Sequence, residues 1–191
     1  MYSVMSEREV ERRYQELLRA LAEEFPGFQL RPKRGSRLHA LIDRALRALS
    51  LGRMDRYLTD FHTTLGQKIY VTDGWEQQSA LSRWATLRHE AVHLRQFQAL
   101  GLPLMVLLYL FLPLPTFLAY GRMRLERAAY EETLRTYYEA GGEATVRDPR
   151  LRHSVISCFT SAAYLWMWPF PGAVATWYDR FVDELTGTRR G

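Results

Sequence analysis

The chain has 191 residues, of which 47% are hydrophobic and 25% are charged, so its composition is that of one globular domain and excludes wholesale disorder. Cys158 is the single cysteine, which excludes a disulfide scaffold and predicts a buried thiol. The net charge is +5, but the densest basic cluster, residues 31–37, carries no nucleic-acid-reading motif, so we predict no nucleic-acid partner.

The N-terminal part of the chain predicts two helices. Ser6 and Glu9 form a capping box, and apolar residues at helical spacing continue the helix until Pro26. Ser36 can cap a second helix that ends near Gly52. The residues before Ser6 lack the apolar core of a signal peptide, so we expect a cytoplasmic protein that can associate with a membrane.

The helical period is lost after residue 52 and returns near Ser79. Residues 61–64 and 68–72 are rich in β-branched and aromatic side chains and predict a short hairpin. Helices are then predicted over about 79–100, ended by Gly101, over 122–140, over 149–168, and from the prolines after 168 to about Thr186. We therefore predict an α+β fold, mostly helical, in a single domain over residues 1–191.

A five-residue motif in the third of these helices carries the chemistry. Residues 89–93 read His-Glu-Ala-Val-His, and on a helix positions i and i+4 share one face. His89 and His93 can therefore bind one zinc ion, while Glu90 lies beside the ion and can take a proton from a water molecule. The alternative is an amphipathic helix whose histidines only form hydrogen bonds.

Catalytic zinc usually keeps three protein ligands, so a third one is needed. No histidine follows at the short spacing of the metzincin motif, because Leu100 stands there. Residues 124–131 read Arg-Leu-Glu-Arg-Ala-Ala-Tyr-Glu, and here the chain resembles the gluzincins, in particular the compact minigluzincins. The resemblance covers about residues 60–140 and implies that Glu126 is the third zinc ligand, with Glu131 as the alternative.

The resemblance has further implications for the fold and for the site. It implies a zincin-like domain, with its core at about 55–170, in which the strand over residues 68–72 is an edge strand before the active-site helix. Thermolysin-like gluzincins carry an aspartate that orients a zinc-bound histidine, and Tyr130 replaces it here. We therefore expect Glu131, another residue or a backbone carbonyl to hold that imidazole.

A hydrolase of this kind also uses a donor for the oxygen of the cleaved carbonyl group. The sequence offers Tyr164, His153 and Tyr130, and we favour Tyr164, although its aromatic surroundings are also typical of a core. His39 and His62 have no partner at ligand spacing, so we expect them to be surface or hydrogen-bonded histidines.

These residues predict a zinc-dependent hydrolase, a peptidase acting on a peptide or protein, with Glu90 as its general base. An extended substrate could add to the strand over residues 68–72. The alternative is a non-catalytic, basic helical interaction protein or an inactive relative that acts at a membrane surface.

The segment over residues 102–120 is almost wholly apolar, and no charged residue lies between Arg95 and Arg122. Its length would suit a membrane span, but a single span would separate His93 from Glu126 by roughly 30 Å of hydrocarbon. We therefore expect an apolar helical insertion, a buried hairpin or core helix broken by its prolines, that returns the chain to the site. A surface-dipping element in contact with lipid and a true span are the alternatives.

Overall fold

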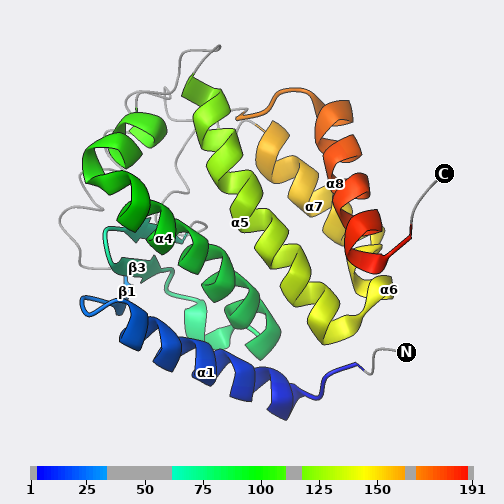
Figure 1. Cartoon of the computed structure of the whole chain (residues 1–191). Helices are drawn as coiled ribbons and strands as arrows, with labels where there is room; N and C mark the ends of the chain where they lie inside the picture. Colours follow the sequence, from blue (N-terminus) through cyan, green and yellow to red (C-terminus); the bar gives the residue numbers. More distant parts are fainter. Residues whose placement is uncertain (1–3, 34–61, 111–117, 162–166, 189–191) are drawn as a thin grey trace.

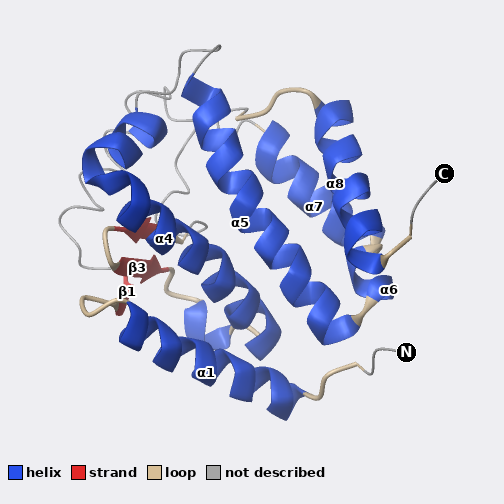
Figure 2. Ribbon diagram, in the orientation of Figure 1, coloured by secondary structure: helices blue, strands red, loops and turns tan. Residues whose placement is uncertain are grey.

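The computed structural model describes residues 4–33, 62–110, 118–161 and 167–188. Figure 1 shows the elements in chain order: α1 (Glu7–Glu24), β1 (Gln29–Pro32), β2 (Thr63–Leu65), β3 (Lys68–Val71), the short 3₁₀ helix η1 (Trp75–Gln77), α4 (Ala80–Leu110), α5 (Leu118–Gly141), α6 (Glu143–Val146), α7 (Pro149–Thr160) and α8 (Pro171–Thr186). The fold is α+β and mostly helical, as predicted. Figure 2 shows the small sheet gathered on one side of α4.

The sheet has three strands in the order β1-β3-β2. The predicted hairpin is confirmed, because β2 pairs antiparallel with β3 across a tight turn at Gly66, which has a φ of 60°. The prediction that the strand over 68–72 lies at the edge is wrong. β1, which the sequence did not predict, pairs parallel with β3 and makes it the central strand. Only four residues long and mostly exposed, β1 has too little pattern to be recognised alone.

The helix α1 begins where its cap predicts. The hydroxyl of Ser6 accepts a hydrogen bond from the backbone N–H of Glu9 at 3.2 Å, which satisfies one donor of the first turn. Val10, Tyr14 and Leu21 are buried. They belong to a hydrophobic cluster, the first core, which also includes residues of β3, of η1 and of the first half of α4: Ile69, Val71, Trp75, Trp84, Leu87, Ala91 and Leu94.

A second core lies on the other side of α5. Its buried residues come from α5, α6, α7, α8 and the chain before α8: Met123, Leu134, Val146, Val155, Phe159, Met167, Val174, Trp177, Tyr178, Phe181 and Val182. The predicted last helix is confirmed and ends at Gly187, whose φ of 72° suits a glycine. The prediction that α7 reaches residue 168 is wrong. It ends at Thr160, where the backbone N–H of Ser161 still donates to the carbonyl of Ser157.

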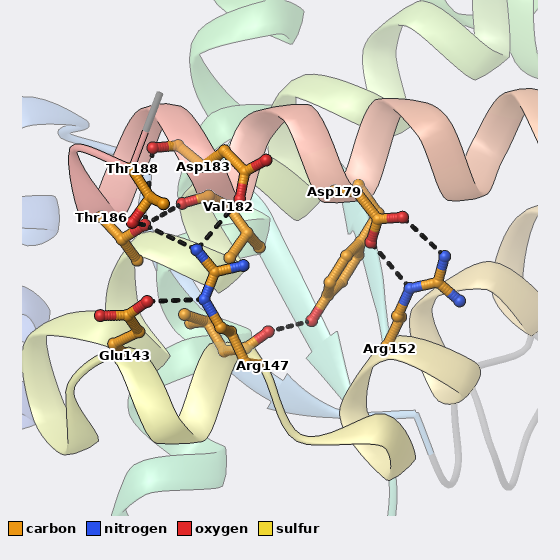
Figure 3. A network of polar contacts seen from close by, with 10 residues as sticks. Glu143, Arg147, Arg152, Asp179, Val182, Asp183, Thr186 and Thr188 are labelled. Carbon is orange, nitrogen blue, oxygen red and sulfur yellow. Dashed lines mark hydrogen bonds and ion pairs between the residues drawn. The ribbon is translucent and has the colours of Figure 1, made fainter. Parts of the chain in front are cut away.

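Ion pairs and hydrogen bonds hold the outer faces of these C-terminal helices together (Figure 3). Arg147, which follows α6, donates to Glu143, Asp183 and Thr186. Arg152 forms a two-pronged ion pair with Asp179 at 2.8 Å. On the outer side of the second core, these two arginines are therefore paired with carboxylates of the neighbouring helices.

The helix α4 breaks at Gly101, which has a φ of 74° and a ψ of 160°, so the predicted stop at this glycine is confirmed. A second helical piece follows at once and runs to Leu110. Its Leu108 packs against α5 at Gly121, where a Cβ atom would lie only 2.6 Å from Leu108 Cδ2. The second piece of α4 therefore lies beside the start of α5, as expected of a chain that returns to the site. The prolines at 113 and 115 lie outside the described residues.

No helix in the described ranges combines the length and the apolar character that crossing a membrane requires. The helix predicted over 36–52 lies in a part of the chain that the structure does not describe.

Candidate metal centre

The histidine motif lies on the first half of α4, between the two cores. The apolar stripe of this helix is buried in the first core, which turns His89 and His93 towards α5. Arg88 fixes the position of α5, because its guanidinium donates to Glu132 at 2.7 Å and to Glu139 at 2.7 Å. One face of α4 therefore packs in the first core, and the neighbouring face carries the two histidines and meets α5.

Glu126 of α5 meets both histidines. Its Oε2 atom lies 3.5 Å from Nε2 of His89 and 3.7 Å from Nε2 of His93. The ligand atoms of the three residues all lie within 4.8 Å of one another. Ligands about 2.0–2.1 Å from a tetrahedral ion are roughly 3.3–3.4 Å apart, so a small closing movement would let this group hold one metal ion.

The other ring nitrogen of each histidine is held by a hydrogen bond. His89 Nδ1 lies 3.1 Å from the hydroxyl of Thr133, which donates its own proton to the carbonyl of Ala129 and therefore accepts from the ring. His93 Nδ1 lies 2.8 Å from the side-chain oxygen of Gln96, whose amide nitrogen donates to the carbonyl of Leu125. Both rings are thus fixed as Nδ1–H donors, which leaves their Nε2 lone pairs for the site.

This arrangement calls for a cation between the three residues. In their neutral forms both imidazoles would point a lone pair at the carboxylate of Glu126, which is repulsive unless a proton or a metal ion lies between them. Burial opposes the charged form of His93, but the charge of Glu126 and hydrogen bonding raise its pKa to about 9. Burial also opposes ionisation of Glu126, yet the histidines hold its pKa well below its ordinary value. The residues present therefore fit a bound cation.

Glu90 is buried next to the group and is held by β2. Its side chain has a relative exposure of 6%. The hydroxyl of Thr64 donates to Oε2 of Glu90 at 2.6 Å. A short bond to a carboxylate is a strong one, and it fixes Oε2 of Glu90.

His62 lies at the same site, although the sequence predicted a surface or hydrogen-bonded histidine. Its ring packs edge-on against Trp75 at a centroid distance of 5.1 Å, and its buried Nδ1 has no hydrogen-bond partner among the described residues. Burial lowers its pKa, and the charges of Glu90, Lys33 and His89 are close enough to act on it. The sequence could have indicated this position of His62 through the alternation of side chains along a strand. Residues 62 and 64 share one face of the hairpin, and Thr64 shows that this face is turned to α4.

The remaining predicted residues divide into two groups. Glu131, the alternative third ligand, pairs with Arg127 at 3.0 Å and accepts from the indole of Trp177, so it points away from the histidines. The ring of Tyr130 lies edge-on against His89 at 4.8 Å. His153 is exposed on α7, whereas Tyr164 and His39 lie outside the described residues.

Comparison of the chain with protein-family models, with curated proteins and with solved structures gave no match. The functional reading therefore depends on the geometry of the site.

Proposed function

We propose that this protein is a zinc-dependent hydrolase that cleaves peptide bonds. The observation that carries the proposal is the convergence of His89, His93 and Glu126, with both imidazoles oriented by their Nδ1–H bonds. Two histidines and one glutamate are a known ligand set of catalytic zinc, which leaves a fourth position for water or substrate.

His89, His93 and Glu126 would hold the zinc ion, which would lower the pKa of a bound water and polarise a carbonyl group. Glu90 accepts the proton of the attacking water and returns it to the leaving amine, which requires that one carboxylate oxygen stay free of other bonds. Thr64 supports this role, because its hydrogen bond to Oε2 holds the side chain of Glu90 in place. His89 and His93 are kept in the correct tautomer by Thr133 and Gln96.

A peptide substrate is proposed because a strand edge lies beside Glu90. β2 is a terminal strand of the described sheet, it contacts α4, and it carries Thr64. An extended peptide can pair with such an edge and present its carbonyl group to the site. Tyr164 is proposed to donate to the oxygen of that carbonyl group, with Tyr130, whose ring contacts His89, as the alternative donor.

The test separates the metal ligands from the base. We expect about one zinc per chain in the wild type, no bound zinc in a His89→Ala/His93→Ala variant, and normal zinc in the control His153→Ala, which changes an exposed histidine. Elemental analysis measures all three. Zinc retained by the double variant would disprove the ligand set.

Glu90→Gln is expected to keep its zinc while hydrolysis falls by about 10²–10⁴-fold, because an amide cannot accept the proton. The assay measures the cleavage of fluorescein-labelled casein and of a mixed peptide library. Wild-type protein that binds zinc but cleaves neither, or a Glu90→Gln variant as active as the wild type, would refute the proposed reaction.

A further inference from the structure

Four of the five exposed large hydrophobic side chains among the described residues belong to elements at one end of the molecule, and Val4 near the N-terminus is the fifth. Next to the break in α4, the relative exposures are 37% for Leu100, 51% for Leu102 and 40% for Leu104. Phe170, at the start of α8, has 65%. In Figure 1 the second piece of α4, the first turn of α5 and the start of α8 lie along the upper edge, opposite α1. We call these four residues the apolar end.

The break at Gly101 creates this surface. The left-handed backbone of Gly101 interrupts the apolar stripe of α4, so that the helix no longer keeps its apolar face on the first core. Met105, one turn further, is fully buried, whereas Leu102 and Leu104 are left outside. Water-exposed leucines next to a buried neighbour cost free energy that contact with another apolar phase would recover.

The charged residues in the sequence stretches that contain the apolar end have one sign. The sequence has no acidic residue from 91 to 125 or from 149 to 178, the stretches that contain the apolar end. Arg122 and Arg124 follow the start of α5, and Arg124 is exposed. A second copy of the chain would bring arginines together without carboxylates to face them, so self-association here is unfavourable. An anionic lipid surface satisfies both the leucines and the arginines.

We propose that the apolar end docks on an anionic bilayer surface, with Leu102, Leu104 and Phe170 entering the interface and Arg124 facing lipid phosphates. His93 lies eight residues before Gly101 on the same helix, which is about 12 Å along the axis. The metal centre is thus held next to the membrane without entering it. This proposal is independent of the proposed hydrolase activity.

The test is sedimentation of the full-length protein with vesicles of phosphatidylcholine and phosphatidylglycerol, compared with vesicles of phosphatidylcholine alone. We expect the wild type to bind the anionic vesicles and Leu102→Ser/Leu104→Ser to bind at least about tenfold more weakly, a loss of about 1.4 kcal/mol. Val4→Ser is the matched control, because Val4 is 73% exposed near the N-terminus. It should bind as the wild type does.

A charge variant tests the second half of the proposal and does not depend on the folding of the leucine variant. Arg124→Gln should weaken binding about fivefold, since one arginine near an anionic surface contributes about 1 kcal/mol. Its control is Arg150→Gln, an exposed arginine on α7. The proposal would be overturned if the wild type did not bind anionic vesicles. It would also be overturned if both arginine variants weakened vesicle binding equally. A wild type that forms dimers which only the leucine variant disrupts would overturn it as well.

Discussion

Two clusters of charged side chains in this protein differ in the groups that face their carboxylates. Around Arg147 and Arg152, on the outside of α6–α8, each carboxylate meets a guanidinium (Figure 3). In the metal centre, Glu126 meets imidazoles, and Glu90 meets a hydroxyl. In the first cluster every carboxylate already faces a positive charge, whereas in the second the imidazole nitrogens and the carboxylate need a proton or a metal ion between them.

The two clusters differ in whether the partner of each carboxylate can give up its proton. An arginine carries its positive charge at every accessible pH, so a carboxylate beside it gains little from a metal ion. A histidine can release its proton to let a metal ion bind. The partner that faces each carboxylate therefore distinguishes Glu126 of α5, a candidate ligand that faces the histidines, from Glu131 of α5, which faces Arg127.

The largest effect that sharpens this comparison is expected at Gln96. In Gln96→Leu, His93 loses the acceptor that fixes its Nδ1–H, and zinc affinity should fall by about 10–100-fold. Competition with a chromophoric chelator measures the affinity. Gln98→Leu is the matched control, since Gln98 is exposed two residues further along α4. Equal affinity in the Gln96 variant and the wild type would mean that the 2.8 Å contact does not orient the ring.

A smaller effect, on stability, is expected in the cluster around Arg147 and Arg152. Arg147→Ala removes the contacts with Glu143, Asp183 and Thr186 and should destabilise the protein by about 1 kcal/mol, the usual value for partly buried polar contacts. Thermal unfolding measures the loss, and the zinc content should stay at the wild-type level. A variant that lost zinc would show that the two clusters are coupled, contrary to the comparison above.

The smallest effect concerns the pair between Glu24 of α1 and Arg95 of α4. The hydrogen bond from Arg95 lowers the pKa of Glu24. The stability that the pair contributes is therefore present above the unfolded pKa of Glu24 and is lost as the pH falls through its folded pKa. Because both groups are over a third exposed, Glu24→Gln should cost no more than about 0.5 kcal/mol at pH 7. In denaturant unfolding, the difference from the wild type should shrink as the pH falls through the folded pKa of Glu24, and a difference that did not change with pH would contradict this origin.

Local patterns allowed much of the fold to be predicted. The cap at Ser6 and the stop at Gly101 depend on residues a few positions apart, and the structure confirms them. The meeting of Glu126 with the histidines followed from a family resemblance together with the requirement that the chain return. From the sequence, only the motif of the resemblance favoured Glu126 over Glu131 as the third ligand.

What the sequence did not predict depends on distant pairing. β1 exists because β3 pairs with it, and that pairing took the edge position away from β3. His62 and Thr64 reach Glu90 only because β2 contacts α4. Thr133 holds His89 because it lies two turns beyond Glu126 on the same face of α5, a relation that needs the packing of α4 against α5 to become visible.

The position of the metal ligands also has a consequence for the unfolded chain. His93 belongs to the half of the molecule built around the first core, and Glu126 lies on the helix that borders the second. A cation held by both closes the whole apolar stretch between them into a loop. Because the unfolded chain does not keep these ligands together, an ion that binds only the folded chain stabilises it by about 2.7 kcal/mol when the free ion is at a hundredfold excess over its Kd. The ion would therefore act as a reversible cross-link between the two helices, in a chain whose single cysteine cannot form an intrachain disulfide.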